Sequence, residues 1–144
     1  MSRYLEQAFL YRHGVVLGLY SVQEVTEWAE RLFDEHEFPD EWMILLVGAQ
    51  NSSDVIEALS PLISELTPEL VWRKLKQLMV AAMEDKRLDG LTALCYAQDF
   101  ATDEDYGDIV PLFYDYEGVQ LGYTAYTVQD IDADVLRFLK GETD

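Results

Sequence analysis

Helix start signals recur along this sequence, and they constrain its fold more than any other feature. Ser21-Val22-Gln23-Glu24 forms a capping box, in which a Ser hydroxyl and a Glu carboxylate three positions later satisfy the first backbone N–H groups of a helix. Apolar residues then recur at helical spacing, which predicts a helix from Val22 to about Glu37, stopped before Pro39. Thr67-Pro68 opens a second long helix, reaching Lys86-Arg87, because a cap residue is followed by proline in the first turn.

The remaining periodic segments complete a mainly α fold. Trp42–Val47 is apolar on every side, which predicts a short helix in the centre of the core. The first helix ends at His13-Gly14, where a protonated histidine would interact favourably with the negative end of the helix and glycine can take the left-handed conformation. Val15–Tyr20 is then an apolar connection, or a further turn of helix broken at Gly18. Together the segments predict six or seven short helices in a single domain over residues 1–144. The other expected helices cover residues 4–12, 55–66 and 91–100. A last helix, capped by Asp130 or Asp132, runs to Lys140-Gly141.

The segment from Ile109 to Tyr126 leaves two predictions open. β-Branched and aromatic residues are frequent in Ile109–Tyr116 and Val119–Tyr126, and Glu117-Gly118 between them could turn a β-hairpin. Pro111 disfavours a central strand because it has no N–H to donate, so short helices fit the same residues. The predicted fold class is therefore mainly α, with or without a small hairpin near the C-terminus.

The composition excludes several classes of partner. Of the 144 residues, 49% are hydrophobic, which is enough for a packed core, and the formal net charge is −18. Such a charge repels nucleic acids and anionic membranes and attracts basic proteins. The single cysteine fits a reducing compartment, no signal peptide is visible, and no apolar run could span a bilayer. We therefore expect a cytoplasmic protein that binds neither nucleic acid nor membrane.

The titratable residues show no catalytic or metal-binding pattern. His36 stands among acids, with no second His or Cys at the spacing of a zinc motif. A calcium loop counted from Asp103 fails, because its sixth residue is not Gly and its twelfth is not Glu. Cys95 lies on an apolar helical face with no basic neighbour, which predicts a buried, unreactive thiol. We expect no metal, no cofactor and no enzymatic activity, and a small enzyme using carboxylates is the least favoured alternative.

The stretch from Leu88 to Leu136 contains no Lys or Arg and carries a formal charge of −11. A compact fold is opposed by so many like charges, whereas a cationic partner would be steered by the charges and would pack on the tyrosine rings among them. The alternative is a solvated acidic surface that keeps the protein soluble, with the tyrosines half-buried. The acids are Asp89, Asp99, Asp103, Glu104, Asp105, Asp108, Asp115, Glu117, Asp130, Asp132 and Asp134. We predict a binding surface made by Asp99, Asp103, Glu104, Asp105, Tyr106, Asp108, Asp115, Tyr116 and Glu117.

One segment resembles a known family. It reads Leu17-Gly18-Leu19-Tyr20-Ser21-Val22-Gln23-Glu24-Val25-Thr26-Glu27-Trp28-Ala29, a glycine followed by a capped helix and a Trp-Ala pair. This opening is similar to that of small bacterial immunity proteins of contact-dependent growth inhibition systems, which are encoded beside polymorphic toxins. The resemblance covers about the first third of the chain. It implies a cytoplasmic, non-enzymatic protein that binds and blocks one cognate toxin domain, and it transfers no binding residues.

Two functions follow from these observations. The first is an immunity protein whose acidic, tyrosine-rich surface neutralises a basic toxin domain, most simply a nuclease, because nucleases hold phosphates with Lys and Arg. The second is a nucleic-acid-mimicking inhibitor, or an adaptor for another basic protein, with no connection to a toxin. The neighbouring gene distinguishes them: a large secreted protein with a variable C-terminal domain supports the first, and a phage or restriction context supports the second.

Overall fold

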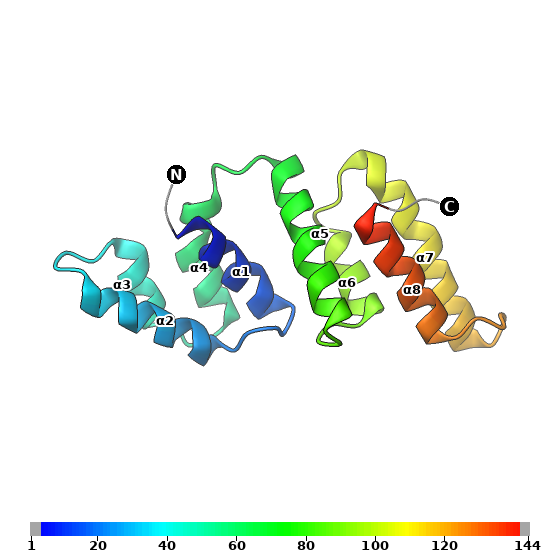
Figure 1. Cartoon of the computed structure of the whole chain (residues 1–144), viewed down its shortest axis with the longest axis horizontal. Coiled ribbons are helices and arrows are strands. Elements are labelled where there is room, and N and C mark those ends of the chain that lie inside the picture. The colour runs from blue at the N-terminus through cyan, green and yellow to red at the C-terminus, as the bar shows by residue number, and fades with distance from the viewer. Residues whose placement is uncertain (1–3, 142–144) are drawn as a thin grey trace. The chain divides into compact units, whose positions relative to one another are not determined.

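The computed structural model describes residues 4–141, and every regular element within them is a helix (Figure 1). The mainly α prediction is confirmed, whereas the predicted six or seven helices are too few and the hairpin alternative at residues 109–126 is wrong. Each helix between residues 4 and 141 is too short or too polar to cross a lipid bilayer. The eight helices are α1 (Leu5–Val16), α2 (Val22–Glu35), α3 (Glu41–Val47), α4 (Ser52–Ile63), α5 (Pro68–Glu84), α6 (Gly90–Ala97), α7 (Asp103–Leu121) and α8 (Val128–Lys140).

These helices form two compact units, of which the first ends at Leu66 and the second begins at Thr67. The first unit contains α1 to α4 and the second contains α5 to α8. The prediction of a single domain over residues 1–144 stays a prediction.

The first unit packs its four helices around an apolar core. α1 packs against α4, and α3 packs against both α2 and α4. Aromatic rings extend this core: the Trp28 and Trp42 rings stack with centroids 5.7 Å apart, and the Tyr4 ring centroid lies 5.6 Å from that of Trp42. Trp28 is partly buried against the core, so the Trp of the resembling segment has a structural place.

The capping box at the start of α2 forms as predicted. The Ser21 hydroxyl accepts a hydrogen bond from the backbone N–H of Glu24 at 3.1 Å, and the Glu24 carboxylate accepts one from the backbone N–H of Ser21 at 3.3 Å. At the start of α5 the Thr67 hydroxyl accepts from the N–H of Leu70 at 3.2 Å. Both helix starts are therefore fixed by local residues, as their sequences indicated.

α3 is less central than its all-round apolar sequence predicted. Trp42, Met43 and Leu46 are buried, but Ile44 and Leu45 are exposed. A short helix of seven residues packed on two neighbours buries only one side, so apolar character on the other side does not produce burial.

α1 continues past Gly14 by the further turn that was one of its two predicted alternatives. It ends at Val16, and Gly18 takes the left-handed conformation with a φ of 77°. His13 lies inside the helix with only 2% of its surface exposed, and its ring centroid is 4.5 Å from that of Phe9. Burial, assisted by the charge of Arg12, lowers the pKa of His13 to about 3. The expected protonated histidine at the helix end is therefore wrong, because this imidazole is neutral at pH 7.

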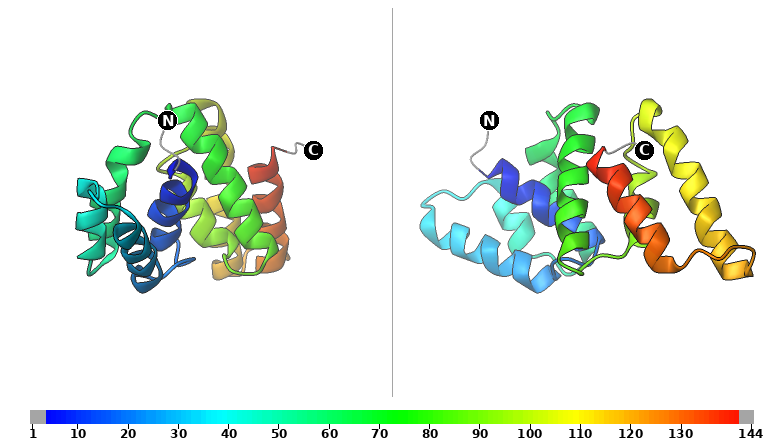
Figure 2. Two further views of the ribbon diagram at one scale, coloured as in Figure 1. Left: turned by 60° about the vertical axis from the view of Figure 1, so that its left-hand side comes forward. Right: turned by 45° about the vertical axis from the view of Figure 1, so that its right-hand side comes forward.

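In the second unit α8 lies between α5 and α7 and also packs against α6 (Figure 2). α8 begins earlier than predicted, because its cap is Thr127 rather than an aspartate. The Thr127 hydroxyl accepts from the N–H of Asp130 at 3.2 Å, and the Asp130 carboxylate accepts from the N–H of Thr127 at 2.9 Å. This second capping box leaves the Asp132 carboxylate available for contacts with other helices.

α7 is helical although its composition favours a strand. Its buried residues Ile109, Leu112 and Tyr116 are three and four positions apart, which is the period of a helix. A strand would have placed Ile109 on the opposite face from the other two. Pro111 lies inside α7 and cannot donate to the carbonyl of Gly107, but Gly107 is exposed, so water can satisfy that carbonyl.

α6 approaches α7 and α8 so closely that its first residue must lack a side chain. A Cβ at Gly90 would overlap the Tyr116 hydroxyl and the Asp132 carboxylate, and it would lie 3.1 Å from the Cα of Asp132. The Tyr116 hydroxyl donates a hydrogen bond to Oδ1 of Asp132 at 2.5 Å. Gly90, Tyr116 and Asp132 therefore join α6, α7 and α8 at one point.

Gly90→Ala should lower the free energy of unfolding by about 1–3 kcal/mol, because the added methyl group forces Tyr116 and Asp132 away from α6. Gly107→Ala is the matched control. No atom lies within 4 Å of a Cβ at Gly107, and alanine inside a helix stabilises it by about 0.5–1 kcal/mol relative to glycine. Urea denaturation measures both changes, and effects of the same sign would contradict the Gly90 contact.

The buried His13 should make the first unit sensitive to acid. Because its pKa falls from 6.5 to about 3 on folding, the unfolded chain binds a proton between these pH values that the folded chain excludes. Stability is therefore lost as the pH falls below 6.5. Relative to His13→Gln, which removes this titration, the wild-type free energy of unfolding should decrease by about 2 kcal/mol between pH 7 and pH 5. Parallel pH profiles of the two proteins would refute this account of His13.

Candidate functional site

α7 carries eight of the nine residues predicted for the binding surface. Asp103, Glu104 and Asp105 form its first turn, where carboxylates interact favourably with the positive end of a helix. The ninth residue, Asp99, is exposed in the turn that follows α6, and its N–H bonds to the carbonyl of Tyr96. The predicted surface thus falls almost entirely on one helix, for much of which the sequence left a helix and a hairpin both open.

Helical spacing produces two stripes of accessible residues on α7. Glu104, Asp108 and Asp115 follow one another at intervals of four and seven and form an acidic stripe; the first two are exposed and the third is partly exposed. The predicted residues therefore do not gather on a single face, and Asp103 lies between the stripes on the outermost side of the helix. The second, aromatic stripe consists of Tyr106, Phe113 and Glu117 at intervals of seven and four.

Tyr116 belongs to the core rather than to the accessible surface. Its ring is buried, and its hydroxyl is the donor to Asp132 described above. Burial raises the pKa of Tyr116 far above its ordinary value, and the hydrogen bond to Asp132 and the negative charges of Asp132, Asp89 and Asp134 raise it further. The phenol is therefore a permanent donor at physiological pH, and its contribution is to hold α7 against α8.

Asp105 is also engaged within the second unit. Its Oδ2 accepts a hydrogen bond from Nε1 of the buried Trp72 at 2.7 Å and lies 3.4 Å from Nζ of Lys76. The same Lys76 nitrogen lies 5.2 Å from the centroid of the Trp72 ring. One carboxylate thus satisfies an indole N–H and pairs a lysine, which ties the first turn of α7 to α5.

Most tyrosines of the basic-free stretch remain accessible. Tyr106, Tyr114 and Tyr126 are exposed, and Tyr123, in the connection between α7 and α8, is 83% exposed. Exposed phenol rings are a common anchor of protein interfaces, because they combine a large apolar area with a polar tip. Tyr114, Tyr123 and Tyr126 were not among the predicted site residues, although their position among the acids was the available signal.

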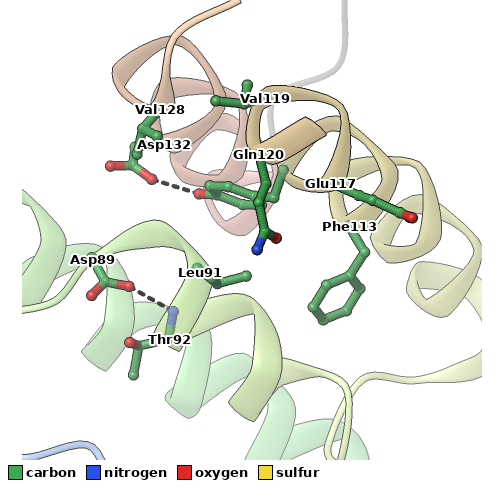
Figure 3. Close-up of a pocket in the computed structure, with 10 residues that line it drawn as sticks. Asp89, Leu91, Thr92, Phe113, Glu117, Val119, Gln120, Val128 and Asp132 are labelled. Carbon is green, nitrogen blue, oxygen red and sulfur yellow. Dashed lines mark hydrogen bonds between the residues drawn. The ribbon is translucent and has the colours of Figure 1, made fainter. Parts of the chain in front are cut away.

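A pocket of about 560 Å³ opens between α6, α7 and α8. Leu91 and Thr92 of α6 face Phe113 and Gln120 of α7 across it (Figure 3). Its other lining residues are Asp89, Tyr116, Glu117, Val119, Val128 and Asp132. Sequence reasoning selected only Tyr116 and Glu117 from this group, because no local pattern shows that three helices bring these side chains together.

The charges around this pocket are of one sign. Figure 3 shows Asp89 and Asp132 on one side of it and Glu117 on the other. None of the residues that line it within the described chain is basic. Together with the acidic stripe, the pocket makes α7 a strongly negative element with accessible apolar side chains.

His36 and Cys95, the residues considered for metal binding and thiol chemistry, belong to no cluster of possible metal ligands among the described residues. Within residues 4–141 no three His, Cys, Asp or Glu side chains come together as metal ligands would. His36 bridges two elements of the first unit, since its Nδ1 donates to the carbonyl of Leu32 at 2.7 Å and its Nε2 lies 3.1 Å from the Tyr4 hydroxyl. Cys95 is exposed, so the predicted buried thiol is wrong: Ala93, Leu94 and Ala97 form the buried side of α6 instead.

Comparison with protein-family models, curated proteins and solved structures gives no match to this chain.

Asp105→Ala should lower the free energy of unfolding by about 1–3 kcal/mol, because it leaves the buried indole N–H of Trp72 without its acceptor. Asp103→Ala removes a neighbouring acid that is exposed, and only a favourable helix-end interaction of about 0.3–1 kcal/mol is lost. Urea denaturation of the two variants compares them directly. If Asp103→Ala proved at least as destabilising as Asp105→Ala, the structural role of Asp105 would be rejected.

Proposed function

We propose that this protein is an immunity protein that binds a basic toxin domain, most simply a nuclease, through α7 and the residues beside it. The observation that carries the proposal is the concentration of accessible carboxylates and phenol rings on and around α7, in a stretch of sequence without Lys or Arg. Complementary charge accelerates association and selects the partner, and aromatic anchors supply affinity.

Inhibition would follow from competition for a cationic surface. A nuclease holds the phosphates of its substrate with Lys and Arg side chains. Carboxylates of the acidic stripe would occupy those side chains, while Tyr106 and Tyr114 pack against the surrounding surface. The bound inhibitor would then exclude the nucleic acid without any chemistry of its own.

The resembling segment supports the same class of function. Leu17–Ala29 contains the cap of α2 and the partly buried Trp28, so its residues serve the packing of the first unit. Because the residues of this opening serve packing, the partner-binding role falls to another part of the chain. The acidic surface of the second unit fits that role.

Reversing the acidic stripe tests the proposal. The triple variant Glu104→Lys, Asp108→Lys, Asp115→Lys should weaken binding to the toxin domain encoded by the adjacent gene by about a hundredfold or more, because each close pair with a cation becomes a repulsion. Asp105 is left intact because it serves the fold. Co-purification and titration calorimetry with that domain provide the measurement.

The matched control reverses three exposed acids of the first unit, Glu30→Lys, Asp34→Lys and Glu37→Lys, and gives the same net charge. It should lose affinity by only a few-fold, through the long-range field. Equal losses for both triple variants would show that overall charge, and not α7, governs binding. Complete absence of an interaction with the adjacent gene's product would remove the toxin from the proposal.

The second candidate function is a nucleic-acid-mimicking inhibitor or an adaptor for another basic protein. The acidic stripe favours this function too, because its carboxylates could imitate the phosphates of a nucleic acid. A phage or restriction gene beside this one, with no secreted toxin nearby, would support it over an immunity function.

A further inference from the structure

The pocket between α6, α7 and α8 has apolar walls that the fold itself does not cover. Leu91 and Val128 are 43% and 47% exposed, and Phe113 and Val119 are partly buried. These side chains come from α6, α7 and α8, which meet where Gly90 lies next to Tyr116 and Asp132. A volume of about 560 Å³ is of the size that accommodates a bulky side chain or small ligand.

Carboxylates border these walls on both sides (Figure 3). Asp89 accepts a hydrogen bond from the N–H of Thr92 at 2.7 Å, and Asp132 accepts one from Tyr116. Each carboxylate has two oxygens and about four acceptor positions, so each retains capacity for a further donor. Glu117 is exposed on the opposite side. An acidic or anionic occupant would be repelled by all three groups, whereas a cation beside an apolar group would be stabilised.

We propose that this pocket is the anchor site of the interface: it receives one bulky apolar side chain of a basic partner segment, and Lys or Arg residues next to that side chain pair with Asp89, Asp132 and Glu117. The identity of the partner as a toxin domain rests on the function proposed above, but the chemistry of the segment follows from the pocket alone. Charge complementarity selects a basic segment, and the apolar walls select its leucine-like or aromatic anchor.

The aromatic stripe connects this pocket with the rest of α7. Phe113 and Glu117 line the pocket, and Tyr106 lies on the same side of the helix two turns earlier. A segment anchored in the pocket could therefore continue along α7 and pack on the exposed Tyr106 ring. Anchor, ring and carboxylates would then form one continuous binding surface.

Two short peptides test the anchor. We would titrate the full chain with acetylated, amidated Lys-Lys-Leu-Trp-Lys-Lys and with Lys-Lys-Ser-Ser-Lys-Lys, following the methyl resonances of the protein. The first peptide should bind at least about tenfold more tightly, because an apolar side chain leaves water, and it should shift the methyl groups of Leu91, Val119 and Val128. Equal affinity of the two peptides, or shifts spread over both units, would overturn the anchor proposal.

Leu91→Gln and Val128→Gln should each abolish the preference for the Leu-Trp peptide. Leu121→Gln is the matched control, since Leu121 is 54% exposed at the end of α7 and does not line the pocket; it should keep the preference. Thermal unfolding of all three verifies that they fold, and two independent wall variants keep the test decisive if one does not. An unchanged preference in both wall variants would contradict the proposal.

The toxin domain then separates this inference from the function on which it rests. If the domain binds and Leu91→Gln does not lower the affinity for it, the anchor proposal fails while the immunity function stands. If the Leu-Trp peptide enters the pocket but the adjacent gene's product does not bind, the anchor stands and the partner must be another basic protein.

Discussion

The hydrogen bond from the Tyr116 hydroxyl to the Asp132 carboxylate joins α7 to α8 at the point where Gly90 lets α6 approach both helices. A phenol is protonated at physiological pH, and burial raises the pKa of Tyr116 further, so its hydroxyl remains a donor. Together with the buried Ile109 and Leu112, this contact sets the rotation of α7, and that rotation decides which residues face water. The acidic stripe and the aromatic stripe follow from the rotation, and Tyr116 and Asp132 themselves line the pocket.

The concentration of negative charge on α7 is tolerated because of where the carboxylates lie. Asp103 and Glu104 stand at the positive end of the helix. Asp105 is paired with Lys76 and hydrogen-bonded to Trp72. The other acids of the helix face water, where a high dielectric and salt reduce their repulsion. The fold therefore uses one carboxylate of the helix for its own packing and leaves the others accessible to a cationic partner.

Local signals in the sequence predicted the starts of α2 and α5 well, because a cap such as Ser21 or Thr67 acts within four residues of itself, whereas the capping box at Thr127 that starts α8 was missed. α7 was ambiguous since β-branched and aromatic residues favour strands, and only the spacing of its buried residues reveals the helix. The burial of His13 and the exposure of Cys95 depend on packing between helices. The pocket could not be predicted for the same reason. The acidic surface was visible in composition, but its division between two stripes required the structure.

The most direct test of the central claim, that α7 docks a cationic protein by its charge, is the rate of association with the adjacent gene's toxin domain at different salt concentrations. Stopped-flow fluorescence can follow the reaction between about 0.05 M and about 0.5 M sodium chloride. Electrostatic steering predicts that the association rate constant falls by about tenfold or more over this range while the dissociation rate constant changes much less. An association rate constant that does not depend on salt would contradict the account.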